Sequence, residues 1–217
     1  MTALHDTKLS FGVIVGGLAM WSSTAMAELK APTFPKTFAG TMIDAYPVDA
    51  MRKGRSGGAL VDLWTNEGGG IYKCDLVSLV GDEKLGRSTC KIVIRFRLEP
   101  AVDSAGTKTM GRHRILLTWL IPGSAQGREV AQTKQRPDLE LTVDRLPTGS
   151  KRLDVVIVLE VKPDGIVQSC QPDAAAAAAY AKTACQNVSG IRFPASPAFE
   201  GAARPYITSA TVRFVTN

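Results

Sequence analysis

Four cysteines, at positions 74, 90, 170 and 185, carry the most distinctive chemistry of this 217-residue sequence. An even number of cysteines favours disulfide bonds in an oxidising compartment, and four cysteines allow three connectivities. The alternative is a zinc site, which commonly uses a C-x-x-C pair or several histidines. The sequence has no C-x-x-C pair, and His113 is its only histidine after residue 27. We therefore expect disulfides and no metal ligands.

Side chains suited to catalysis are few. His113 lies between Arg112 and Arg114, whose positive charges lower its basicity, and the sequence contains no G-x-S-x-G motif. Asp82 and Glu83 open a predicted helix, where carboxylates stabilise the helix N-terminus without any chemistry. The glycines at 68–70 are not followed by Gly-Lys-Ser/Thr, so they predict a hairpin turn rather than a phosphate-binding loop. We expect no enzymatic activity, no catalytic residue and no cofactor.

An internal repeat positions the cysteines. Residues 85–90 (LGRSTC) align without gaps with residues 180–185 (YAKTAC), and Arg-Phe followed by Pro-Ala recurs after each. Each copy contains two apolar strand patterns joined by a Gly-bearing turn, then a helix, then a closing strand of alternating residues, at 112–121 and 207–215. The sequence predicts an α+β fold of two tandem small units, each with an antiparallel sheet of about three strands and a helix on one face.

Turn and helix signals place the cysteine pairs. Residues 162–165 (KPDG) predict a hairpin turn, and residues 81–84 (GDEK) predict a helix start. Asp173 and the alanines at 174–179 predict the equivalent helix start in the second copy. Cys74 then ends a strand and Cys90 lies on the following helix, so a Cys74–Cys90 bond would join helix to sheet, as would Cys170–Cys185. Each such bond stabilises the fold by up to about 3 kcal/mol.

The N-terminus indicates export. Residues 1–27 resemble a signal peptide, with an apolar stretch at 11–21 and an A-x-A site that places cleavage between Ala27 and Glu28. An uncleaved anchor helix is the alternative. We expect a short extension at 28–42, a first unit at 43–122, a flexible linker at 123–136 and a second unit at 137–217, with residues 138–146 either a strand or part of that unit. The mature chain is not expected to span a membrane.

The charge is positive but dispersed. The sequence has 26 Lys and Arg against 20 Asp and Glu, a formal net charge of +6. The basic residues form no stripe, and an exported protein rarely meets nucleic acid. We therefore expect no nucleic-acid partner, and attraction to anionic envelope surfaces instead.

Residues 46–57 (YPVDAMRKGRSG) resemble the YPxxAxxxGxxG opening of the TonB C-terminal domain family. Phe96, Pro100-Ala101 and Gly106 are similar to later positions of that family, and a strand-to-helix cysteine pair resembles a variant found in it. The resemblance covers about residues 43–122 and extends more weakly to about 140–217, where the Tyr-Pro opening is missing. It implies a periplasmic domain that pairs with a short segment of an outer-membrane receptor by strand addition, without any catalytic group.

The function expected from these observations is non-catalytic binding of an envelope or outer-membrane protein in the periplasm, through a sheet edge. The candidate edge residues are Arg112, Arg114, Leu116 and Thr118 in the first closing strand, and Ser209, Thr211 and Arg213 in the second. One alternative is that these strands lie in the centre of the sheet, and another is that they pair with each other across the two units. A further alternative is a TonB-type energy transducer with an uncleaved inner-membrane anchor. From Glu28 to Tyr46 there are only 19 residues, and they span at most about 63 Å.

Overall fold

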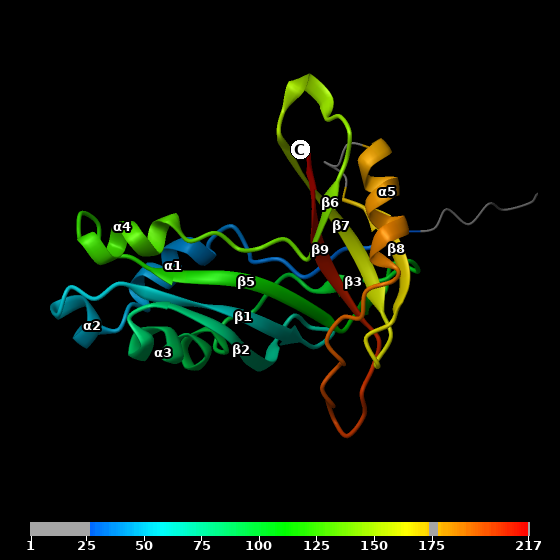
Figure 1. Cartoon of the computed structure of the whole chain (residues 1–217). Helices are drawn as coiled ribbons and strands as arrows, with labels where there is room; N and C mark the ends of the chain where they lie inside the picture. Colours follow the sequence, from blue (N-terminus) through cyan, green and yellow to red (C-terminus); the bar gives the residue numbers. More distant parts are fainter. Residues whose placement is uncertain (1–26, 174–177, 217) are drawn as a thin grey trace, which may run out of the picture.

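The computed structural model describes residues 27–173 and 178–216, and within them one large mixed sheet organises the chain (Figure 1). Six strands follow the order β2-β1-β5-β9-β7-β8, and a seventh, β6, pairs with β9. The bounds of these strands are β1 Gly57–Thr65, β2 Ile71–Gly81, β5 Gly111–Trp119, β6 Leu139–Thr142, β7 Arg152–Val161, β8 Val167–Pro172 and β9 Tyr206–Val215. A small separate sheet contains β3 Ala101–Val102 and β4 Lys108–Thr109.

Five α-helices and one short 3-10 helix are described. They are α1 Phe38–Asp44, α2 Val48–Arg52, α3 Glu83–Val93, α4 Ala125–Gln132, the 3-10 helix Pro147–Gly149, and α5 Ala178–Val188. Asp82 caps α3 as predicted, because its carboxylate accepts a hydrogen bond from the Leu85 N–H at 2.8 Å. The predicted start of the other helix includes residues 174–177, which lie outside the described residues, as does the predicted signal peptide up to residue 26.

The two halves of the sheet share one order of elements. Along the chain, the first half contains β1, β2, α3 and β5, and the second half contains β7, β8, α5 and β9. Within the sheet, the strands of the first half lie antiparallel in the order β2-β1-β5, and those of the second half lie antiparallel in the order β8-β7-β9. The predicted hairpin turns are confirmed: Gly69 and Gly165 adopt φ values of +78° and +90°, which glycine tolerates. The α+β class predicted from the sequence is therefore confirmed.

The helices α3 and α5 cover opposite faces of this sheet. Leu63 of β1 packs in a cluster with Val93 of α3, whereas Ala184 of α5 packs in a second cluster with Phe214 of β9. Trp64 follows Leu63 and so points to the other face, where it joins the α5 cluster. Its ring lies edge-on to Tyr206, with centroids 5.0 Å apart. Each half thus has its own core, and Trp64 joins them across the junction.

The halves meet where β5 and β9 pair in parallel, at Gly111 with Ile207 and at Arg112 with Thr208. Beyond these pairs the two strands diverge, as Figure 1 shows. The closing strands therefore pair with each other, which was one of the alternatives drawn from the sequence. β9 has β7 along one side, and β5 followed by β6 along the other.

The prediction that β9 is an edge strand is wrong, because both of its sides are paired. The predicted contact residues Ser209, Thr211 and Arg213 pair with Val158, Val156 and Asp154 of β7. On the opposite side of β9, β6 covers the strand from Val212 to Val215. Sequence patterning does not reveal this arrangement, since it depends on a segment about 70 residues away in the chain.

The connection at 123–136 also differs from the flexible linker that we expected. It contains α4, whose N-cap Ser124 accepts a hydrogen bond from the Gly127 N–H at 2.9 Å. Val130 is 1 % exposed, and the Gln126 side chain accepts a hydrogen bond from the Ser56 N–H at 2.9 Å. Gly127, which has no side chain, and the apolar Val130 let the helix pack where β1 begins and β2 ends, so a polar composition did not make this segment a free joint.

Candidate functional site

The outer half of β5 forms an open edge of the sheet. Met110 O accepts a hydrogen bond from Ile207 N at 3.0 Å, which shows that the backbone groups of even-numbered residues point toward the β9 side. The backbone groups of Leu116 and Thr118 therefore point the same way. No strand of residues 27–173 and 178–216 pairs with β5 on this side beyond Arg112. Leu116 and Thr118 were predicted as edge residues, and the topology places both on this open stretch.

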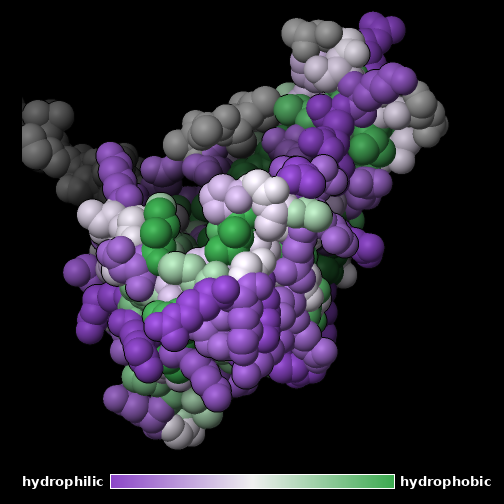
Figure 2. All heavy atoms as spheres, turned by 90° about the vertical axis from the view of Figure 1, so that its left-hand side faces the viewer, coloured by the Kyte–Doolittle hydropathy of each residue, from purple (hydrophilic) through white to green (hydrophobic). Residues whose placement is uncertain are grey.

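An apolar groove of about 440 Å³ lies between the open edge and α1. The wall from α1 and the turn after it consists of Phe38, Ala39, Met42, Ile43 and Tyr46, and the opposite wall is residues 116–120 of β5 and its continuation. Ile43 is 70 % exposed and Leu120 39 % exposed, although both are large apolar side chains. Viewed from this end, Figure 2 shows hydrophobic atoms beside a hollow and a broad hydrophilic surface below them. The groove thus exposes apolar surface directly beside unpaired strand backbone.

Tyr46 fixes the end of α1 against β5. Its hydroxyl donates to Arg55 O at 2.5 Å, and its ring lies edge-on to Trp119 with centroids 5.5 Å apart. Partial burial raises the pKa of the Tyr46 hydroxyl above its ordinary value. Met42, 9 % exposed, packs with Trp119 in the same cluster. Neither α1 nor its groove was predicted from the sequence, although Phe38 and Met42 are four residues apart, the spacing of one helix face.

Arg112 and Arg114, also predicted as edge contacts, are instead paired with Asp62 of β1. Arg112 is 1 % exposed and donates to Asp62 Oδ1 at 2.7 Å. Arg114 donates to both oxygens of the same carboxylate, at 2.8 and 2.9 Å. Burial by itself raises the pKa of Asp62, but the hydrogen bonds from Arg114 and the charge of Arg112 outweigh it, so the pKa lies below its ordinary value. These two arginines therefore tie β5 to β1 within the first half, beside the junction, rather than face a partner.

His113 is enclosed by the N-terminal segment. Its ring lies edge-on to Phe34, with centroids 5.4 Å apart, and its Nδ1 is buried with no hydrogen-bond partner in the described residues. Burial lowers the pKa of His113, and the neighbouring charge of Arg112 lowers it further, against a raising hydrogen bond with the Pro32 backbone. The ring therefore favours its neutral form at this position in the sheet.

Both predicted disulfides are present. Cys74 bonds to Cys90 and Cys170 bonds to Cys185, and in each pair the Cα atoms are 5.6 Å apart. Each bond joins the second strand of its half to the helix that follows, as expected, but Cys74 lies near the start of β2 rather than at its end. With all four sulfurs in these bonds, no cysteine thiolate remains as a zinc ligand.

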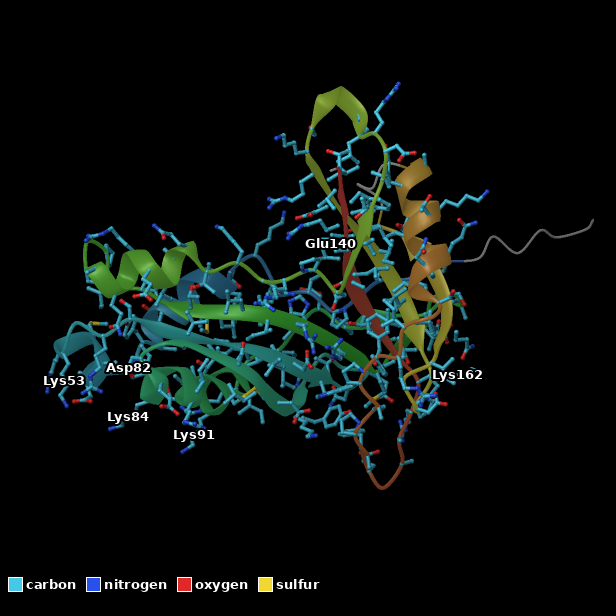
Figure 3. The ribbon with its side chains drawn as sticks, viewed as in Figure 1. Lys53, Asp82, Lys84, Lys91, Glu140 and Lys162 are labelled. Carbon is cyan, nitrogen blue, oxygen red and sulfur yellow. A yellow bond between two sulfur atoms is a disulfide. The ribbon has the colours of Figure 1, made fainter. Side chains whose placement is uncertain are left out.

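Basic side chains gather elsewhere. Figure 3 shows Lys53, which follows α2, and Lys84 and Lys91 of α3 extending outward, away from the sheet. Several charges there are paired within the chain, as in the 2.8 Å contact between Lys53 Nζ and Asp49 Oδ1. This hydrophilic surface is distinct from the apolar groove.

The strand registers show which part of β9 corresponds to the open edge of β5. In the first half Cys74 lies opposite Leu63, which lies opposite His113; in the second half Cys170 lies opposite Leu159, which lies opposite Thr208. His113 therefore corresponds to Thr208, and residues 117–120 correspond to residues 212–215. Residues 212–215 are the stretch that pairs with β6 in parallel. The edge that is open in the first half is thus occupied by a strand in the second.

Compared with protein-family models, with curated proteins and with solved structures, the chain matches none. No helix in the described part of the chain is both long and apolar enough to cross a membrane.

Proposed function

We propose that this protein is a non-catalytic binding protein that takes up an extended segment of a partner on the open edge of β5, by strand addition. The observation that carries this proposal is β6, which pairs in parallel with the corresponding stretch of β9. The fold thus already accepts an added strand at the equivalent edge. Strand addition supplies affinity through main-chain hydrogen bonds and selectivity through alternate side chains.

The chemistry of β6 indicates the chemistry of the partner segment. Leu139 and Leu141 pack against the core on the α5 side, whereas Glu140 and Thr142 are exposed. In the first half the corresponding side of the sheet carries α3 and α1, so the inward side chains of an added strand would enter the groove beside α1. We infer a segment that runs parallel to β5, with apolar residues at alternate positions and polar residues between them.

The compartment and the family are part of the same proposal. Two disulfides in one chain are typical of an oxidising compartment. Together with the predicted signal peptide, they support the periplasm and an envelope or outer-membrane protein as the partner. The resemblance of residues 46–57 to the TonB C-terminal domain supports two tandem units of that type, because both halves have the order strand, strand, helix, strand.

A peptide with the sequence of residues 136–145 (RPDLELTVDR) tests the binding mode, since it carries the strand that fits the equivalent edge. We expect it to bind the oxidised chain in titration calorimetry and to protect the Leu116 and Thr118 amides from hydrogen exchange. A scrambled peptide of the same composition is the control for charge and hydrophobicity.

Two substitutions at one position separate the edge from the side chain. Thr118→Pro removes an N–H that points to the open side, where proline is tolerated in an edge strand, and blocks an added strand. Thr118→Val keeps that N–H and nearly the same shape. We expect Thr118→Pro to weaken peptide binding at least about tenfold, and Thr118→Val to leave it within about twofold. Equal binding by the two variants, both with unchanged circular dichroism, would contradict the proposal.

A further inference from the structure

We propose that β9 carries a second segment-binding edge and that β6 is the chain's own occupant of it. This inference rests on the proposed function and deepens it, because it determines how many partner segments one chain binds and what competes with them. Three observations support it: β6 makes only a few contacts with β9, it pairs with no other described strand, and it lies where β5 and β9 diverge.

Asp138, the residue before β6, anchors the start of that strand. Its N–H donates to Thr211 O at 2.8 Å, and its carboxylate Oδ2 accepts from the Thr211 N–H at 2.8 Å. A side-chain oxygen thus replaces the backbone carbonyl that a longer strand would supply. At the other end, Val143 N donates to Val215 O at 2.9 Å. Between these ends Leu139 and Leu141 are only partly buried against the core. β6 therefore binds β9 as a short peptide would, with a polar anchor and two apolar contacts.

β6 can leave without dismantling the fold. Among the described strands it pairs with β9 alone, and it lies off the main path of the sheet. β7 pairs with β9 along its whole length, from Arg152 to Val161, and the Cys170–Cys185 bond holds α5 on β8. Residues 133–137 before β6 and 143–146 after it form neither helix nor strand. Release of β6 would thus expose the edge of β9 from Thr211 to Val215 while its antiparallel partner stays in place.

Asp138 also faces the first edge. Its Oδ1 lies 3.9 Å from Arg114 Nη1 on β5, so one carboxylate contacts both diverging strands. Figure 3 shows Glu140 on β6 next to this divergence. A tethered strand has an effective concentration of about millimolar order, so a free segment at micromolar concentration does not displace it. The intact chain is therefore expected to bind one segment, on β5, while β6 keeps the second edge closed.

Releasing β6 tests this inference. Leu141→Glu places a charge on the core-facing side of β6, and Thr142→Glu places the same charge on the exposed side of the next residue, which makes it the matched control. We expect the Thr211 amide to exchange at least about tenfold faster in Leu141→Glu than in the wild type or in Thr142→Glu. With the peptide of residues 136–145, we expect calorimetry to give about one site per chain for the wild type and Thr142→Glu, and about two for Leu141→Glu.

A second variant covers the case in which the glutamate does not release β6. It replaces residues 138–142 by Gly-Ser-Gly-Ser-Gly, which can make neither the Asp138 contacts with Thr211 nor the two leucine contacts. A protected Thr211 amide in that variant would show that β6 does not cover the edge and would overturn the inference. An exposed Thr211 amide with one binding site that still requires Thr118 would also overturn it, and would leave the proposed function standing. No binding to the wild type but one site after release would refute the β5 site and support the β9 edge.

Discussion

Replacing Asp62 by asparagine tests how the buried charges that join β1 to β5, beside the junction of the two halves, are stabilised. The wild-type carboxylate receives one hydrogen bond from Arg112 and two from Arg114, and Arg112 is almost fully buried. Asparagine keeps the shape and one acceptor oxygen but removes the charge. The Arg112 guanidinium would then remain buried beside a second positive charge, with the Trp64 ring at 6.0 Å as a weak compensation. Removing one partner of a buried ion pair lowers the free energy of unfolding by about 3–5 kcal/mol. Because asparagine keeps one acceptor oxygen, we expect Asp62→Asn to cost about 3 kcal/mol.

The second half of the sheet provides a matched control. Asp154 on β7 accepts two hydrogen bonds from Arg213 on β9, at 2.7 and 3.0 Å, in the same cross-strand arrangement. The Asp154 side chain is 37 % exposed and the Arg213 side chain 19 %, so solvent screens this pair. We expect Asp154→Asn to cost no more than about 1 kcal/mol. The two substitutions therefore remove the same charge and the same two-bond cross-strand pair, but Asp62 is more buried and also loses its contact with Arg112.

Urea unfolding of the oxidised chain, followed by tryptophan fluorescence at pH 7, measures both free energies. The sign of the pH dependence follows from the direction of the shift, because the pKa of Asp62 is lowered in the folded state. Its contribution is fully present above the unfolded-state pKa of about 3.9 and is lost as the pH falls through the lower folded-state value. Wild type and Asp62→Asn should therefore converge in acid. Equal costs for Asp62→Asn and Asp154→Asn at pH 7 would refute the view that burial makes Asp62 the stronger contact.

Three further predictions concern other elements. Removing the Cys74–Cys90 bond by double alanine substitution should lower the free energy of unfolding by up to about 3 kcal/mol, with a cost in urea titrations close to that of the Cys170–Cys185 pair, since the two loops are 16 and 15 residues long. Burial lowers the pKa of His113, so stability should fall as the pH drops below its unfolded-state value of about 6.5, and His113→Gln should lose this dependence in the same titration. Asp82→Ala should cost about 1 kcal/mol through loss of the α3 cap, whereas Asp82→Asn, which keeps an acceptor, should cost less; equal losses in thermal melts would contradict a capping role.

Local signals explain what the sequence predicts well. The hairpin at 162–165 follows from a proline and a glycine two positions apart in the turn, and the start of α3 follows from one capping aspartate. The disulfide pairing follows from the repeat, because both members of each pair lie within 16 residues. Each of these features depends on residues that are near one another in the chain, so periodicity and turn chemistry suffice to find them.

Long-range pairing explains what the sequence does not predict. The apolar alternation of β5 and β9 marks both as strands but does not say which strand lies beside each of them. That choice depends on Gly111 and Ile207, which are 96 positions apart, and on β6, whose four residues carry no strong strand signal. Arg112 and Arg114 look like surface residues by composition, and only the register with Asp62 shows that they are paired inside.

The difference between the two edges follows from the path of the chain. In each half the chain must travel from the junction to the far end of the closing strand, because the first strand of the half begins there: Gly57 lies opposite Trp119, and Arg152 lies opposite Val215. In the second half, residues 139–151 connect the junction to the far end of β9. This segment begins with the strand β6, and because a strand rises about 3.3 Å per residue, few residues are needed to cover the distance.

In the first half, residues 34–56 cover the same distance with many more residues, and α1 takes up the excess because a helix rises only about 1.5 Å per residue. A helix satisfies its own backbone hydrogen bonds, so α1 lies beside β5 without pairing with it. The edge and the apolar groove of the first half are therefore the direct consequence of a helix standing where the second half has a strand. Shortening this segment until it must run extended should close the groove, and peptide binding at Thr118 should be lost with it.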